Sequence, residues 1–349
     1  MNGADTLLQS LVNNGVEVCF TNPGTSEMHM VAAIGESDGM RSILCLFEGI
    51  CSGAADGYMR MAGKPACTLL HLGPGLSNAS ANLHNARKAH SAVLNLVGDH
   101  ATYHKQYDAP LNSDVEGLAA PLSHWVKTVG SAEDLAEDAA DAVCASRTLP
   151  GQIATLIVPA DCAWDDAASA AQEKNPTTPP TADNKAVELA AALLANGKDT
   201  IILMSNMALT ESGLEMADKI AQQTGARIFS DTFDARLPRG EGRCKAERLG
   251  YFAEQALEQI GDAQQFIMVG TSAPVAFFAY PGKASRFTAD DATLHTLAEV
   301  HENAEDALQR LVEAVGAQQQ KPRYAALKKP GLLTGELSPK ALAFAVAEY

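Results

Sequence analysis

The chain has 349 residues, 46% hydrophobic and 19% charged, and its 26 Lys and Arg against 42 Asp and Glu give a formal net charge of −16. This length predicts two or three domains, and the acidic balance repels phosphate backbones and anionic lipid, so we expect neither nucleic acid nor membrane as a partner. Seven cysteines lie singly without zinc-site spacing, and neither a secretory leader nor an apolar run of about 20 residues occurs, which predicts a reduced, cytoplasmic protein.

Helices and strands alternate through the first half of the chain. Residues 4–14 have leucines at helical spacing and end at Gly15, which predicts a helix. Apolar runs predict buried strands at 16–20, 43–47, 66–72, 92–98 and 153–159, with helical stretches between them. This alternation is typical of a doubly wound parallel sheet.

Glu48 is the first candidate for chemistry. It follows the apolar run 43–47, so the pattern predicts a carboxylate at the carboxyl end of a buried strand, with small residues after it that allow close helix packing. A carboxylate is costly to bury there unless it is paired. In open α/β sheets, ligands bind at this end of the strands.

A second α/β region follows a change in composition. Residues 165–184 are rich in Pro, Thr and Ala without periodicity, which is typical of a linker. Strands are then predicted at 200–205, 226–231, 265–272 and 292–299, with helices between them, including one over 246–261. We expect domains at 1–165 and 185–317, a linker at 166–184, and at 318–349 a linker with the first helix of a further domain.

Four motifs suggest a family. These are NPGTSE at 22–27, Phe47-Glu48-Gly49, ADGYMRMAGKPA at 55–66 and GPGLSNA at 73–79. In this order they resemble the N-terminal, pyrimidine-binding domain of thiamine-diphosphate enzymes of the acetolactate synthase and benzoylformate decarboxylase group. The second α/β region resembles the central domain of that family. The resemblance implies two doubly wound parallel-sheet domains, with the C-terminal diphosphate-binding domain absent from these residues.

The resemblance also implies roles for individual residues. Glu48 would hydrogen-bond to N1′ of the thiamine pyrimidine and favour the imino form that activates the cofactor, and His71 would protonate or orient a carbanion as a second catalytic residue. Contacts to the cofactor are expected from Asn22, Pro23, Gly24, Gly73 and Asn78, and contacts to substrate from Thr25 and Phe278. Structural alternatives remain open: a capping or ion-paired Glu48, a structural His71, and a helix N-cap supplied by Thr25 or Ser26.

Other ligands are less well supported. Gly73-Pro74-Gly75 predicts a turn, but Asn78 stands where a dinucleotide fingerprint needs its third glycine, so NAD is not expected. His100 and His104 could chelate a metal if helical, yet a solvated loop is the preferred interpretation, and we predict no metal site in this chain. By resemblance, the Mg²⁺ ligands would lie in the absent domain, and we find no flavin signal.

Together these features predict a thiamine-diphosphate-dependent enzyme that decarboxylates a 2-oxo acid and ligates the product to an acceptor, as acetolactate synthase does. Its family arrangement implies a homodimer or homotetramer. One alternative is a 2-oxo-acid decarboxylase of benzoylformate decarboxylase type. Another is a non-catalytic two-domain binding or regulatory protein.

Overall fold

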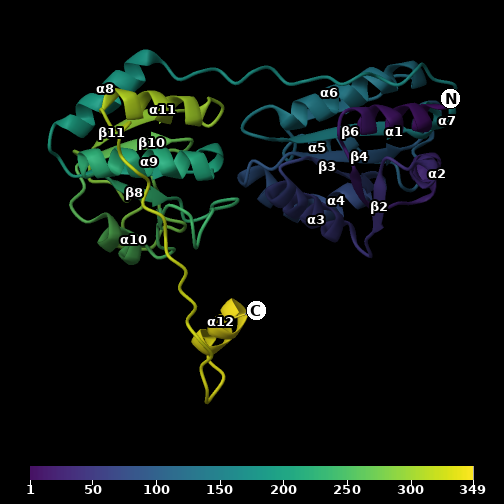
Figure 1. Cartoon of the computed structure of the whole chain (residues 1–349). Helices are drawn as coiled ribbons and strands as arrows, with labels where there is room; N and C mark the ends of the chain where they lie inside the picture. Colours follow the sequence, from purple (N-terminus) through teal and green to yellow (C-terminus); the bar gives the residue numbers. More distant parts are fainter. Residues whose placement is uncertain (349) are drawn as a thin grey trace. The chain divides into compact units, whose positions relative to one another are not determined.

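A computed structural model describes residues 1–348. The chain divides into two compact units, the first at Met1–Pro179 and the second beginning at Pro180. Each contains one sheet in which all neighbouring strands are parallel. The prediction of two doubly wound α/β sheets is therefore confirmed (Figure 1). None of the helices within residues 1–348 is long and apolar enough to cross a membrane.

The first unit has a six-stranded sheet in the order β2-β1-β3-β4-β6-β5. Its strands are β1 (Val18–Asn22), β2 (Arg41–Leu44), β3 (Ala66–Leu70), β4 (Val93–Asp99), β5 (Trp125–Thr128) and β6 (Ile153–Pro159). Its helices are α1 (Gly3–Asn13), α2 (Met28–Glu36), α3 (Glu48–Ala62), α4 (Leu72–Lys88), α5 (Val115–Ala119), α6 (Leu135–Arg147) and α7 (Ala160–Trp164).

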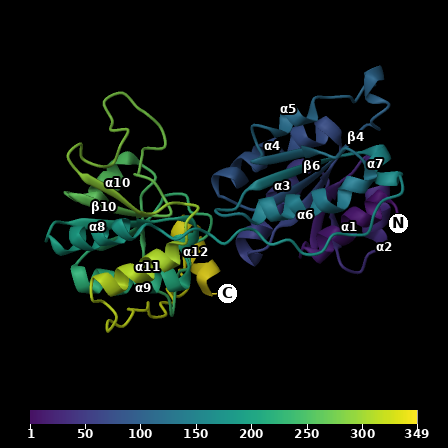
Figure 2. The ribbon, with the colours of Figure 1, turned by 90° about the horizontal axis from the view of Figure 1, so that it is seen from above.

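Alternation along the buried strands divides the core of this unit into two layers. Leu94 and Leu96 of β4 join the apolar cluster under α1, α2 and α6, whereas Val93 and Val97 join the cluster under α3, α4 and α5. Figure 2 shows α1 and α6 on one side of the strands and α4 and α5 on the other. A strand with apolar residues on both faces is typical of a parallel sheet covered by helices on both sides.

The second unit has a five-stranded sheet in the order β11-β10-β7-β8-β9. Its strands are β7 (Thr200–Met204), β8 (Arg227–Ser230), β9 (Glu247–Arg248), β10 (Gln265–Val269) and β11 (Thr293–Ala298). Its helices are α8 (Asn184–Ala195), α9 (Glu211–Thr224), α10 (Ala253–Ile260), α11 (Ala304–Ala314) and α12 (Pro339–Glu348). Residues of α8, α9 and α11 form one core cluster with the sheet and residues of α10 form another.

Several predicted elements need correction. The strand predicted at 43–47 is the edge strand β2, which ends at Leu44 and is largely exposed, so Glu48 is the first residue of α3 rather than the tip of a buried strand. The turn predicted at Gly73-Pro74-Gly75 is the first turn of α4, where proline is well tolerated because the first helical N–H groups lack intrahelical partners. The helix predicted over 246–261 begins only at Ala253, after the short strand β9.

The segment after β6 lies along α1. The Asn13 amide and the Thr6 hydroxyl donate hydrogen bonds to the carbonyls of Ala171 and Ala168, and the Lys174 N–H donates to Asn14 Oδ1. The first half of the stretch predicted as a linker is thus fixed to the first unit, because polar side chains of α1 satisfy its backbone groups.

Strand order determines where a ligand site is expected in the first unit. The chain runs from β1 to β2 on one side of β1 and then crosses to β3 on its other side. The carboxyl ends of β1 and β3 therefore flank the topological switch point, which is where open α/β sheets bind ligands.

Candidate functional site

A buried carboxylate stands at the switch point. After β1 the chain forms the 3-10 turn η1 (Thr25–Glu27), and Glu27 is fully buried. Its Oε2 accepts a hydrogen bond of 2.7 Å from the Gly24 N–H, and its Oε1 accepts one of 3.0 Å from the Ser26 hydroxyl. The alternative of a helix N-cap supplied by Thr25 or Ser26 does not hold, since neither side chain caps a helix and the Glu27 carboxylate satisfies the backbone at this turn.

His71 completes this group from the neighbouring strand. It directly follows β3, its side chain is 22% exposed, and its Nδ1 lies 2.8 Å from Glu27 Oε2 and 3.4 Å from Ser26 Oγ. An ionised carboxylate accepts the proton on Nδ1, so Nε2 is the ring nitrogen left for a ligand. The next residue, Leu72, has a φ of +50°, which is strained for a bulky side chain. Residues with such backbone strain cluster at functional sites.

Two glycines make room for the side chains of Glu27 and His71. A Cβ on Gly98 would lie 1.8 Å from Glu27 Oε1, and a Cβ on Gly24 would lie 2.2 Å from His71 Nδ1. Both positions lack a side chain because the carboxylate and the imidazole occupy that space.

Glu48 lies close to this group. It is half-buried at the start of α3, and its Oε2 accepts a hydrogen bond of 3.0 Å from the Asn78 amide on α4. A Cβ on Gly75 would lie 3.4 Å from Glu48 Oε1 and 3.5 Å from His71 Cβ. Glu48 and His71 therefore flank the same glycine, although 22 intervening residues separate them in sequence.

The small residues that follow Glu48 pack within the chain. The Asn82 amide of α4 donates to the Gly49 carbonyl at 2.6 Å, and the Ser52 hydroxyl donates to the Ala79 carbonyl at 2.9 Å. A Cβ on Gly53 would lie 3.0 Å from the Asn82 amide nitrogen. These contacts hold α3 against α4 and so fix Glu48 beside Asn78.

The other predicted residues divide between the units. Asn22 donates to the Cys45 carbonyl at 2.8 Å, which ties the end of β1 to the loop before Glu48, and Pro23 continues that turn. A Cβ on Gly73 would lie 2.3 Å from Ser113 Oγ, so this glycine permits close packing of α4. Phe278 belongs to the second unit, where its half-exposed ring lies 4.5 Å from that of Phe277.

A pocket of about 280 Å³ opens beside His71. Thr25 and Ser26 reach it from η1, and His100 and His104 reach it from the turn after β4, with ring centroids 5.6 Å apart. Neither histidine lies in an α-helix, and within residues 1–348 no group of three or more His, Cys, Asp or Glu side chains is arranged to hold a metal ion.

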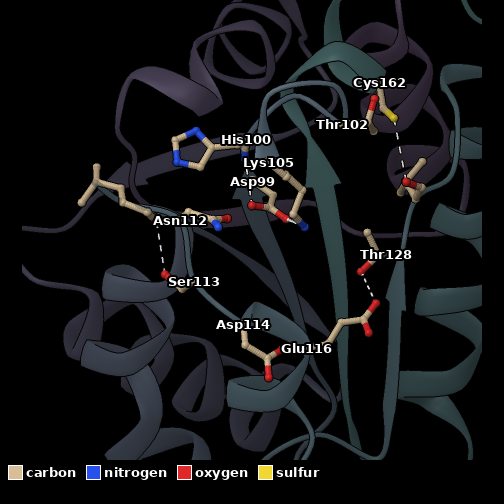
Figure 3. Close-up of polar contacts among 12 residues, drawn as sticks. Asp99, His100, Thr102, Lys105, Asn112, Ser113, Asp114, Glu116, Thr128 and Cys162 are labelled. Carbon is tan, nitrogen blue, oxygen red and sulfur yellow. Dashed lines mark hydrogen bonds and ion pairs between the residues drawn. The ribbon is translucent and has the colours of Figure 1, made fainter. Parts of the chain in front are cut away.

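The turn that carries these histidines is fixed by Asp99. This carboxylate is 1% exposed, lies 2.5 Å from Lys105 Nζ, and accepts a hydrogen bond of 2.8 Å from the His100 N–H (Figure 3). Sequence reasoning missed both this ion pair and the role of Glu27. The carboxylate three residues after Gly24 in NPGTSE was the available signal, but nothing local showed that it would meet His71.

A second pocket, of about 360 Å³, lies in the second unit at the carboxyl ends of β8 and β10. Asp231 and Phe277 line it, and the Thr271 hydroxyl donates to Asp231 at 2.5 Å. Burial raises the pKa of Asp231. Burial also raises the pKa of nearby Asp234 to about 6, even though Ser205 donates a hydrogen bond of 3.0 Å to it.

The fold and the carboxylate–histidine group at the switch point agree with the cofactor-binding class suggested by the sequence motifs. Residues 1–119 match the family described as "Thiamine pyrophosphate enzyme, N-terminal TPP binding domain". The resemblance to thiamine-diphosphate-dependent enzymes is thereby confirmed.

Individual relatives extend the likeness over nearly the whole chain. The chain is 47% identical over 340 residues to IlvX of Mycobacterium tuberculosis, whose name assigns it to the acetolactate synthase large subunits, and the match covers 97% of this chain and 65% of that protein. It is 30% identical over 152 residues to benzoylformate decarboxylase of Pseudomonas aeruginosa, covering 43% of this chain and 28% of that enzyme.

A solved structure shows the same fold at lower identity. The thiamine diphosphate-dependent 4-hydroxybenzoylformate decarboxylase of Rhodococcus jostii RHA1 superposes with a TM-score of 0.78 at 18% identity, covering 96% of this chain and 66% of that one. The chain thus spans about two thirds of the length of the M. tuberculosis and R. jostii proteins.

Gly98→Ala tests the packing around Glu27. The added methyl group would displace the buried carboxylate from His71, so we expect a loss of about 1–3 kcal/mol in the free energy of unfolding, typical of overpacking. Urea denaturation measures it. Gly57→Ala is the control, because a Cβ there meets nothing within 4 Å. Equal stability of Gly98→Ala and wild type would contradict the packing account.

Asp234→Asn tests the buried acid in the second unit. A folded-state pKa of about 6, above the unfolded value of about 3.9, means that the stability present below the unfolded value is lost as the pH rises from about 3.9 to about 6. The amide cannot ionise, so the variant should gain about 3 kcal/mol over wild type at pH 8 and nothing at pH 3. Urea denaturation at both pH values, with exposed Asp290→Asn as control, measures the difference. A gain of equal size at both pH values would refute the assignment.

Proposed function

We propose that this protein takes part in thiamine-diphosphate-dependent decarboxylation of a 2-oxo acid, followed by carboligation of the acetolactate synthase type. The observation that carries the proposal is the placement of Glu48 beside Asn78 and Gly75, with His71 on the other side of that glycine. The 47% identity to IlvX supports the same class of reaction.

The residues around Glu48 fit the pyrimidine end of the cofactor. Glu48 is a half-buried carboxylate with an amide partner on Oε2, and a glycine without a side chain lies beside its Oε1. Such a carboxylate is a strong acceptor for a ring N–H in a partly dry site. In the proposal, the pyrimidine ring is surrounded by Asn22, Pro23, Gly24, Gly73 and Asn78. Mg²⁺ and the diphosphate are held by residues outside this chain.

Each residue then has a defined task. When bound, thiamine diphosphate supplies the nucleophilic carbon and the electron sink that decarboxylation requires. Glu48 holds a proton shared with pyrimidine N1′ and so sets the tautomer of the ring. Thr25 hydrogen-bonds to substrate.

The Glu27–His71 pair favours a second candidate function, simple decarboxylation of the benzoylformate decarboxylase type. With Nδ1 bound to a buried carboxylate, a protonated His71 can donate the proton on Nε2 to a carbanion.

Glu48→Gln tests the role common to both candidates. The amide keeps the size of the side chain and an acceptor for Asn78 but cannot exchange a proton with N1′, so we expect turnover to fall at least about 10²-fold with the fold unchanged. Carbon dioxide release from 2-oxo acids is measured with thiamine diphosphate and Mg²⁺, on the protein as purified from its native cells. Wild-type rates in this variant would refute the assignment.

Product analysis in the same assay separates the candidates. Acetolactate from pyruvate supports carboligation, and aldehyde from an aromatic 2-oxo acid supports simple decarboxylation. Glu17→Gln is a matched control, because Glu17 is an exposed carboxylate that pairs with Lys64 on the surface.

The surface next to Glu48 supports a homodimer or homotetramer. Leu44, Leu46, Phe47 and Ile50 are 70%, 89%, 48% and 53% exposed, and such a group of large apolar side chains is typical of a protein interface. In the proposal, a second copy of the chain covers this surface.

Leu46→Glu tests this interface. A charge placed among the apolar contacts should dissociate the oligomer, giving a smaller mass in multi-angle light scattering at concentrations where wild type is a dimer or tetramer. Leu189→Glu, at another exposed leucine, should leave the mass unchanged. A monomeric wild type, or an oligomer indifferent to Leu46→Glu, would exclude this surface as the interface.

A further inference from the structure

The pocket beside His71 has an unusual set of polar groups. Hydroxyl, phenol and imidazole groups line it, and no carboxylate, Lys or Arg side chain is among its described lining residues. The polar ones are Thr25, Ser26, His71, His100, Tyr103 and His104. Each of these side chains can donate a hydrogen bond. In a chain with a net charge of −16, such a pocket is locally suited to an anion.

The carboxylates nearest to this pocket are all engaged. Glu27 accepts hydrogen bonds from Gly24, Ser26 and His71. Asp99 is bound to Lys105 and to the His100 N–H. The turn that carries His100 is held from its far side by a third carboxylate, Asp161, which accepts from the Thr102 N–H at 3.0 Å. Glu27 takes the Ser26 hydroxyl and the His71 Nδ1 proton, which leaves His71 Nε2 and the side chains of Thr25, His100, Tyr103 and His104 as the donors for a ligand.

One polar atom of a lining residue points to a missing partner. His100 Nε2 is shielded from solvent and has no hydrogen-bond partner among residues 1–348. Figure 3 shows His100 and Asn112 above and beside the Asp99–Lys105 pair. A buried polar atom without a partner is rare in native proteins, and a ligand or an ordered water is the usual explanation.

We propose that this pocket binds the distal carboxylate of a 2-oxo dicarboxylic acid, and that His100 and His104 select this substrate class. The inference rests on the proposed function, which brings a 2-oxo acid to His71. A volume of about 280 Å³ lies just below the range of about 300–1,000 Å³ for drug-sized ligands, so a small metabolite fits. The apolar remainder of the lining, including Leu72 and Trp164, covers the carbon chain between the two carboxylates.

The test is calorimetric titration of the whole chain, without thiamine diphosphate, with 2-oxoglutarate and with 2-oxohexanoate, a monoacid of similar length. Hydrogen bonds to a charged group are the strong ones, so 2-oxoglutarate should bind at least about tenfold more tightly. His100→Gln and His104→Gln should each reduce this ratio, and His84→Gln, on an exposed part of α4, should not. Circular dichroism verifies folding, and because His104 is exposed, its variant is informative even if His100→Gln unfolds.

Three results would overturn the proposal. These are the absence of any preference for the diacid, a preference that persists in both histidine variants, and the absence of measurable binding by either acid. Failure of the proposed function is seen separately, as wild-type turnover in Glu48→Gln, because Glu48 is not part of this pocket and that variant should keep the diacid preference.

Discussion

The site in the first unit depends on one buried carboxylate. Glu27 has no exposed surface, and a charge in that position is stable only with several hydrogen bonds. It receives them from the backbone of its own turn, from Ser26 and from His71 of the next strand. The same contacts fix the turn after β1, orient the imidazole after β3, and require a residue without a side chain at Gly98 on β4.

Close packing of α3 on α4 supplies the other half of the site. Small residues on α3 let the Asn82 amide and the Ser52 hydroxyl bond across to the facing backbone. Glu48 begins α3 and Asn78 belongs to α4, so the approach of the two helices brings carboxylate and amide together. The role proposed for Glu48 requires preorganisation of this kind, because a partner already in place need not reorganise on binding.

Much of this could be predicted from the sequence. Apolar runs located β3, β4 and β6 closely, because strands covered on both faces have nearly continuous apolar residues. The motifs around Asn22, Glu48 and Asn78 indicated the cofactor class. The apolar run before Glu48 was predicted to be a buried strand, but Leu46 in it is 89% exposed. The prediction failed because an apolar run has the same pattern in sequence whether its own chain covers it or not.

The sequence by itself determined the alternation of strands and helices, the family resemblance and the candidacy of Glu48 and His71, since these depend on local periodicity and on motifs of adjacent residues. Only the tertiary structure decided that Glu27 meets His71, that Gly75 separates His71 from Glu48, and that His100 and His104 share a pocket with Thr25. Those contacts join residues that are distant in the chain. They follow from strand order, which brings the ends of β1, β3 and β4 to one edge of the sheet, and local pattern carries no information about that order.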